Sequence, residues 1–411
     1  MAGEISAALV ANLEESGATF TVAFEGVSDT TLSDMTPREV ILGESLLTPG
    51  LQTSITFDSY THTLGKDFDE FRNSTVNINI QAPLLAAYGM QSELEVLQKV
   101  YRIDNRKPIN NNTQRLTLRA CDQSQLDDPK TLVSKSYKCT TPDSVVADVL
   151  GTCLGVQRAS IETSGYPRDY VADNIHPFQV IQQQTNYAVA AGSDPSFLHY
   201  MTYEDLGTHH FRSLFALTKE DPVMTFAFNE IGTHADPFSI LNYSFPCDFD
   251  ILSDILNGID EYGRNINSLI LLNPLDKSFS FFNQEFNLFG CGIGSGVIKT
   301  AISNQTTAQR QDMCPDYSKD YMQFRQSRMS LLEKDKIALR LIVPFNPMLN
   351  AGKIIDVQLN SKEAYPSSVL NYGSGQYMIL HMFHHIHAGG LATTTMDCVS
   401  KTAGNRGAII L

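Results

Sequence analysis

Four histidines lie close together near the end of the chain, within residues 376–401: His381, His384, His385 and His387. Imidazole nitrogens are common zinc ligands, with bond lengths of about 2.0–2.1 Å. In a strand alternate side chains share a face, so His381, His385 and His387 would lie along one line. That line is about 20 Å long at about 3.3 Å per residue, which is too long for one ion to bind all three. His385 and His387 could bind an ion as a pair, with a third ligand from elsewhere in the chain.

The histidines allow two interpretations. A soluble metal-dependent enzyme would use the strand that carries His381 and His387. In the structural alternative, the same imidazoles lie at contacts between sheets or subunits. We adopt the structural interpretation, and we therefore predict no metal ligand, no cofactor and no enzymatic activity. Metal analysis of the purified protein would distinguish the two hypotheses.

Two other motifs are similar to catalytic sequences but lack the required context. The glycine-rich residues 290–296 lack the Gly-Lys-Ser/Thr ending of a phosphate-binding loop, which indicates a flexible turn. Residues 151–155, with Cys153 at the centre, are similar to a nucleophile elbow. Such an elbow opens a helix, whereas this segment closes a predicted helix at Gly155. We therefore predict no catalytic and no cofactor-binding residue in the chain.

Strands must position the histidines. Residues 376–401 are typical of two strands joined by a turn at Gly389 and Gly390. The first strand is apolar or aromatic on both faces, which predicts a central place in a sheet. Residues 337–359, just upstream, predict a strand, a turn containing Pro347 and Gly352, and another strand.

The rest of the chain changes character along its length. Residues 18–122 predict short strands, one short helix and a polar hairpin loop at 105–114, which fits a small antiparallel barrel or sandwich. Residues 123–225 predict a helix beginning at Thr141, a helix from His176 to about 191, and a hairpin, which together form an α+β module. Residues 290–320 predict a long loop.

Composition sets further bounds. The chain has 411 residues and a formal net charge of −15, which fits about three domains and argues against tight nucleic-acid binding. Its seven cysteines form no C-x-x-C pair, which predicts reduced thiols. The sequence predicts no signal peptide at the N-terminus and no transmembrane helix.

Residues 337–401 have the pattern NPxLxAGKxIDVxL, a long loop, YxIxxxxHxIxxGG and a threonine-rich strand. This pattern resembles the last barrel strands of central hub proteins in the baseplates of contractile-tailed bacteriophages. Those proteins are similar to the N-terminal part of type VI secretion spike proteins. Segments 134–150, 173–184 and 197–217 resemble the α+β module of the same hub proteins.

The resemblance implies a mainly β fold with two tube-like antiparallel β-barrels and two smaller α+β modules. The implied division is a first barrel at 1–122, an α+β module at 123–225, a second barrel at 226–264 and 322–411, and an inserted module with a long loop at 265–321. No spike-like or lysozyme-like extension follows residue 411, so we expect spike and wall-degrading enzyme to be separate chains.

The resemblance also implies a function. The chain would be a structural virion protein, made in the host cytoplasm and placed in the tail baseplate, and no membrane partner is expected. As a homotrimer it would join the hexameric tail-tube protein to the trimeric spike protein and contact baseplate wedge or sheath-initiator proteins. Tape-measure protein and DNA would leave through its channel during genome ejection, without specific binding.

The end of the chain suggests one contact. Residues 402–407 contain Gly404 and Gly407 and are typical of a linker. The apolar residues Ile409, Ile410 and Leu411 follow. Because water disfavours exposed apolar side chains, we predict that these three residues contact the spike or a neighbouring hub subunit.

Overall fold

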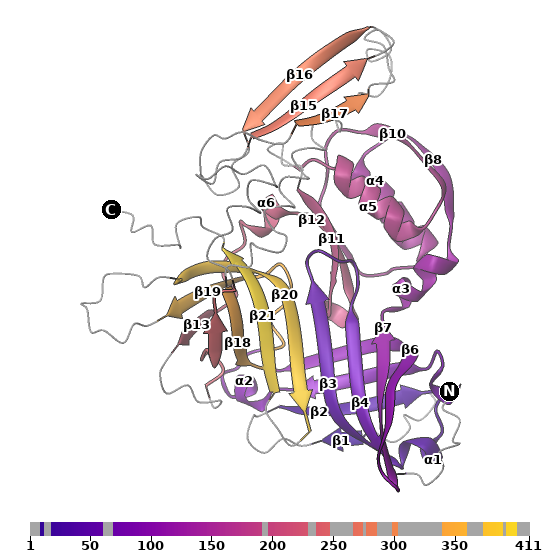
Figure 1. The fold of residues 1–411 in the computed structure, drawn as a ribbon, viewed down its shortest axis with the longest axis vertical. Helices are drawn as coiled ribbons and strands as arrows, with labels where there is room; N and C mark the ends of the chain where they lie inside the picture. The colour runs from indigo at the N-terminus through magenta and orange to yellow at the C-terminus, as the bar shows by residue number, and fades with distance from the viewer. Residues whose placement is uncertain are drawn as a thin grey trace, which may run out of the picture.

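The computed structural model of the chain describes residues 9–11, 18–60, 69–190, 196–228, 236–246, 266–273, 277–285, 298–302, 339–359, 373–388 and 392–400. The fold is mainly β with few helices, as the sequence predicted (Figure 1). Thirteen strands form one continuous sheet in the order β1-β2-β5-β6-β7-β4-β3-β20-β21-β18-β14, with β19 and β13 branching from β20. In the described part of the chain, no helix is long and apolar enough to cross a membrane.

The first half of this sheet comes from the N-terminal part of the chain. Its strands are β1 (Leu9–Ala11), β2 (Thr19–Glu25), β3 (Met35–Ser45), β4 (Gln52–Ser59), β5 (Thr75–Gln81), β6 (Glu93–Asn110) and β7 (Thr113–Cys121). Apolar and polar residues alternate in β5, so that Val76, Ile78 and Ile80 are buried between partly exposed neighbours. The sheet curls until β1 lies close to β3, and the buried side chains fill the barrel that results.

The second half of the sheet closes in a similar way. Its strands are β13 (Thr225–Phe228), β14 (Asn242–Ser244), β18 (Leu339–Pro344), β19 (Ile354–Leu359), β20 (Gly375–His387) and β21 (Ala392–Ser400). Strand β13 pairs with β19 and bridges at Ala227 to Ser239. Leu241 N then donates to Ile342 O of β18, which completes the circuit. A separate apolar core that includes Phe226, Leu341 and Met396 fills this second barrel.

One seam joins the two barrels. Strand β20 pairs antiparallel with β3, from His381 opposite Ser45 to His387 opposite Glu39. The same strand pairs with β21 on its other side and with β19 at its beginning. We call the pairing of β3 with β20 the seam. Its strand β20 contributes Met382 to the core of the second barrel and Ile386 to the core of the first.

An α+β module packs on the barrels. It contains α3 (Gln123–Asp127), β8 (Val133–Thr140), α4 (Pro142–Asp148), β9 (Ala159–Ile161), β10 (Arg168–Ile175), α5 (Pro177–Tyr187), β11 (Phe197–Thr202), β12 (Thr208–Ser213) and α6 (Leu214–Leu217). Its hairpin β11–β12 reaches the first barrel, since Met201 and Tyr203 are buried in the core of that barrel. The short elements are α1 (Asp29–Leu32), α2 (Pro83–Ala87), η1 (Asp69–Phe71), η2 (Asp128–Lys130), η3 (Val149–Cys153) and η4 (Glu204–Leu206).

A third unit stands apart from the large sheet. Strands β15 (Ile266–Asn273), β16 (Ser278–Glu285) and β17 (Ile298–Ile302) form a separate three-stranded sheet in the order β16-β15-β17. Figure 1 shows this sheet at the end of the molecule opposite β1–β4. The predicted long loop at 290–320 lies outside the described residues, apart from β17.

The structure corrects three expectations from the sequence. The segment 105–110 is not a loop, because β6 continues to Asn110 and pairs with β7 almost to the turn. Strand β3 was not predicted at all, although it forms half of the seam. Cys139 is disulfide-bonded, whereas reduced thiols were expected throughout; among the other described cysteines, Cys121, Cys153 and Cys398 are free.

Candidate functional site

A buried carboxyl group lies where both barrels and the α+β module meet. Glu44 comes from β3 and is only 2% exposed. Its side chain points to the inner side of the seam, whereas the side chain of the neighbouring Ser45 points to the outer side. A carboxyl group is costly to bury unless hydrogen bonds replace the lost water. The contacts of Glu44 therefore show which segments the fold holds together here.

Three segments supply these contacts. Tyr203 N, just after β11, donates to Glu44 Oε1, and Ala351 N, in the loop between β18 and β19, donates to Oε2 at 2.8 Å. In one of the two orientations of its side-chain amide, Asn350 donates to Glu44 Oε1 and to the carbonyl oxygen of Leu349, over 3.2 Å each. One side chain of the first barrel thus binds the backbone of the module and of the second barrel.

The environment of Glu44 favours its neutral form. Burial raises the pKa of Glu44 to about 8, although the two backbone donors act in the opposite direction. The nearby negative charge of Glu204 raises the pKa further. At neutral pH the carboxyl group is therefore mostly protonated. In the other orientation of the Asn350 amide, its oxygen accepts a hydrogen bond from the protonated carboxyl group. The site is a structural junction whose protonation changes just above neutral pH.

Apolar packing surrounds this junction. Nine buried residues from the end of β3, the module and three strands of the second barrel (β19, β20 and β21) form one cluster: Leu46, Leu198, Tyr200, Leu214, Leu217, Ile354, Met378, Leu380 and Val399. Gly352 approaches so closely that an added Cβ would lie 3.2 Å from Tyr200 Oη, and its φ of +90° also favours glycine. The Ala-Gly-Lys part of the sequence pattern is therefore explained by close packing at this junction.

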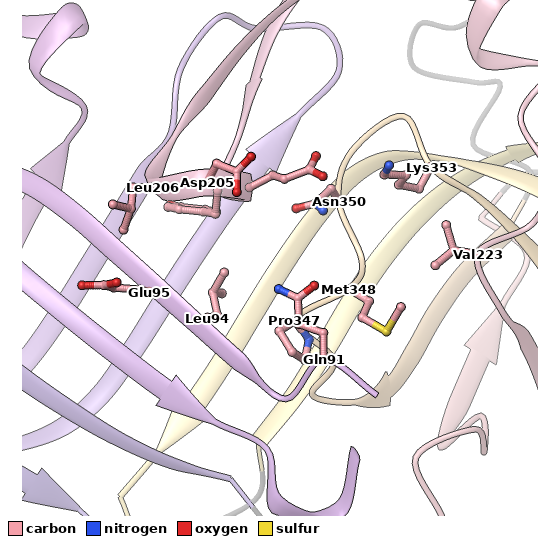
Figure 2. Close-up of a pocket in the computed structure, with 12 residues that line it drawn as sticks. Gln91, Leu94, Glu95, Asp205, Leu206, Val223, Pro347, Met348, Asn350 and Lys353 are labelled. Carbon is pink, nitrogen blue, oxygen red and sulfur yellow. The ribbon is translucent and has the colours of Figure 1, made fainter. Parts of the chain in front are cut away.

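An open pocket of about 400 Å³ lies beside the junction. Figure 2 shows Asp205 and Leu206 on one side, Lys353 on the other, and Asn350 and Met348 between them. The described residues that line the pocket include three carboxylates but no serine, cysteine or histidine. The pocket is thus a polar cleft between the first barrel, the α+β module and the second barrel.

The outer face of the sheet around the seam is polar, and its buried or half-buried aspartates are paired with arginines. Asp58 accepts hydrogen bonds from Arg115 and Arg38 at 2.8 Å each. Burial alone would raise the pKa of Asp58, but these two arginines hold it below its usual range. Asp397 forms a two-bond pair with Arg340 at 2.6 and 3.0 Å. Three further charged residues form a small network on β6 and β7: Arg102, Asp104 and Arg119.

The four histidines of β20 divide between the two faces of the seam. His384 is buried, its Nδ1 lies 2.8 Å from Thr394 Oγ1, and burial lowers the pKa of His384 to about 3. His381, His385 and His387 lie on the outer face, as predicted. His387 Nδ1 is 3.4 Å from Glu39 Oε1 on β3, and the ligand atoms of Glu39, His385 and His387 all lie within 4.8 Å of one another. Glu39 is the carboxylate that lies beside this histidine pair, and the sequence alone did not identify it.

A second group of histidines lies in the hairpin β11–β12. His199 Nε2 is 3.2 Å from His209 Nδ1, and His209 Nε2 is 3.0 Å from Ser124 Oγ. Thr202 Oγ1 is 2.9 Å from His210 Nε2. Burial lowers the pKa of His209 and of His210 to about 4. These neutral rings therefore act as buried hydrogen-bonding groups between the hairpin and α3.

The other motifs named from the sequence lie at the end of a helix or outside the described residues. Cys153 ends the helical segment Val149–Cys153, and Gly155 follows with φ of +65°, so the segment closes a helix as predicted and is no nucleophile elbow. Burial raises the pKa of Cys153, which disfavours the thiolate. The glycine-rich residues 290–296 and the predicted contact residues Ile409, Ile410 and Leu411 lie outside the described residues.

Sequence reasoning missed Glu39 and Glu44 because it missed β3. One signal was present: Glu44 interrupts the apolar run from Val40 to Leu47. A glutamate inside such a run needs buried partners, which marks a contact between segments. Its partners are 159 and 307 residues away along the chain, so the sequence did not identify them.

Comparisons with known proteins connect this architecture to tail proteins. No protein-family model matches the chain, and no curated protein matches it by sequence. The tail protein from Neisseria meningitidis MC58 is similar in structure, with a TM-score of 0.55, 9% identity, and coverage of 95% of this chain and 98% of that chain.

The 43 kDa tail protein of prophage MuSo2 from Shewanella oneidensis has a TM-score of 0.55 at 8% identity, with coverage of 89% and 97%. A chain of the lidded Francisella PdpA-VgrG complex has a TM-score of 0.50 at 9% identity; 94% of this chain matches 53% of that chain. These likenesses show that the chain has the fold of phage tail proteins, as the resemblance predicted.

Proposed function

We propose that this chain is the central hub of a contractile-tail baseplate, which joins the tail tube to the spike. The observation that carries the proposal is the seam, because it joins two barrels within one chain that has the fold of phage tail proteins. Three copies would present six barrels to a hexameric tube, while three equivalent ends would face a trimeric spike. The function rests on a match of symmetry and not on a catalytic group.

Part of β6 pairs on one side only among the described strands, and this supports closure of a ring. Strand β5 pairs with β6 only from Glu93 to Lys99, and residues 101–110 pair with β7 alone among the described strands. Edge strands of this kind pair readily with another chain. Tyr101 is 53% exposed and Ile109 is 51% exposed on this edge. We assign the edge to contact with the next hub subunit in the ring.

The outer face of the seam suits a channel wall. DNA is held by arginine and lysine side chains that are free to contact phosphate. Here Arg38, Arg115 and Arg340 each pair with an aspartate. A trimer in which each chain carries −15 would carry −45 formal charges in total. We infer an acidic or neutral wall, along which DNA and tape-measure protein move without specific binding.

Two further parts of the proposal come from the sequence. The predicted domain boundaries, at residues 122, 225, 264 and 321, stay a prediction, and so does docking of Ile409, Ile410 and Leu411 onto the spike or a neighbouring subunit. Deleting residues 408–411 should weaken hub–spike or hub–hub association while each subunit stays folded. Unchanged assembly would contradict this docking.

Imaging of the assembled tail tests the hub. We expect three copies in one ring between tube and spike; six copies in one ring would contradict the proposal. In the purified hub–spike complex, Tyr101→Asp should reduce the mass from that of a trimer, because a charge on the edge opposes strand pairing. The matched control is Leu132→Asp, at a residue that is 58% exposed in the module, which should leave the mass unchanged.

A further inference from the structure

The outer face of the seam carries a second constellation, independent of the hub function. His385 and His387 are two residues apart on β20, so their side chains share a face. Glu39 on β3 lies directly opposite His387 in the register of the seam and diagonal to His385. Two imidazoles and one carboxylate therefore meet across the boundary between the two barrels.

The distances fit one small cation. Around a tetrahedral zinc ion with bonds of about 2.0–2.1 Å, neighbouring ligand atoms lie about 3.3 Å apart. The separation of 3.4 Å between His387 Nδ1 and Glu39 Oε1 already matches this edge. All three ligand atoms lie within 4.8 Å of one another, so a shift of at most about 1.5 Å brings the His385 nitrogen to the same ion.

The surroundings leave these groups available. Glu39 and His387 are 28% and 50% exposed, so an ion can reach them from solvent. The neighbouring cation Arg115 is held by two hydrogen bonds to Asp58. In the sheet register Thr56 lies opposite Glu39 and Thr393 lies opposite His385, which places two hydroxyl residues on the same face.

We propose that Glu39, His385 and His387 bind one divalent transition-metal ion of the zinc class across the seam. Nitrogen ligands from imidazole and one carboxylate oxygen favour Zn²⁺ over Ca²⁺ or Mg²⁺, which prefer all-oxygen sites. Water completes the fourth position. The ion is a structural link: it joins β3 of the first barrel to β20 of the second at the end of the seam where His387 faces Glu39.

Metal binding to the full-length, tag-free chain tests the site. After removal of metal with EDTA, the protein is titrated with ZnCl₂ by calorimetry, and Co²⁺ is added in parallel to record the visible absorption of a four-coordinate site. We expect one ion per chain. His385→Ala, His387→Ala and Glu39→Gln should each weaken binding at least about tenfold, since even residues that only orient a ligand cost about 10–100-fold.

His381→Ala is the matched control, because His381 lies on the same face of the same strand but outside the cluster. It should keep full affinity, and all four variants should keep the thermal midpoint of the metal-free protein. Zinc should raise the midpoint of the wild type and of His381→Ala only, because an ion that binds the folded state alone stabilises it. Absence of stoichiometric binding, or binding that survives His385→Ala and His387→Ala, would overturn the proposal.

Discussion

The inner and outer faces of the seam each carry a glutamate, in opposite environments. Glu39 and Glu44 lie five residues apart on β3 and so point to opposite sides of the sheet. Glu44 is enclosed, accepts hydrogen bonds from two distant backbone segments, and has a pKa raised by burial to about 8. Glu39 faces solvent beside His385 and His387. Alternation along one strand thus separates a structural junction from a surface that can bind a ligand.

Removing each carboxyl group in turn should give the largest difference in the free energy of unfolding between the two faces. Glu44→Ala leaves Tyr203 N and Ala351 N buried without an acceptor, and we expect a loss of about 3–5 kcal/mol in the free energy of unfolding. Glu39→Ala, the control on the same strand, should change it by no more than about 0.5 kcal/mol without metal. Urea denaturation measures both. Equal effects of the two substitutions would show that Glu44 does not hold the junction.

The pH dependence of stability sharpens the comparison. The pKa of Glu44 is about 8 in the folded state and about 4.3 in the unfolded chain, so the folded state keeps a proton that the unfolded chain has lost. Stability from this group is fully present below about pH 4.3 and is lost as the pH rises through 8. Glu44→Gln does not titrate. The stability of the wild type relative to this variant should fall by about 2–3 kcal/mol between pH 5.5 and 8.5.

Measuring a difference between two proteins matters here because other groups titrate in the opposite sense. Burial lowers the pKa of His209 and His210 to about 4, so their contribution is present above about pH 6.5 and is lost as the pH falls through 4. Both proteins share that contribution, and it cancels in the difference. A difference that stays flat from pH 5.5 to 8.5 would mean that Glu44 is ionised in the folded state throughout.

Loss of an ion pair on the outer face should reduce the free energy of unfolding by less than loss of Glu44 does. Asp58 is nearly buried and binds both Arg115 and Arg38, so Asp58→Asn should cost about 1–2 kcal/mol of unfolding free energy. Asp69→Asn removes the exposed pair of Asp69 with Arg72 and should cost less than about 0.5 kcal/mol. Denaturation at constant pH compares the two. If Asp58→Asn is no more costly than Asp69→Asn, the outer face is held by backbone pairing alone.

Local sequence determined much of the secondary structure. The alternation at Val76, Ile78 and Ile80 predicted β5, and the sequence from Thr141 to Gly155 predicted a helix with its end. These predictions succeeded because side-chain period and turn chemistry act between neighbours in the chain. The pattern at 337–401 also predicted the final strands and the fold of the whole, by resemblance to hub proteins.

Only the tertiary structure revealed the seam and its two sites. Strand β3 contains Pro37, Gly43 and alternating charges, which weaken its local signal, and it is held by pairing with β4 and β20. Glu39 gains its histidine partners and Glu44 its backbone donors from segments more than 150 residues away. Periodicity within one segment carries no information about which distant segment lies beside it. Packing of the two barrels against one another therefore decided what the polar residues of β3 contact.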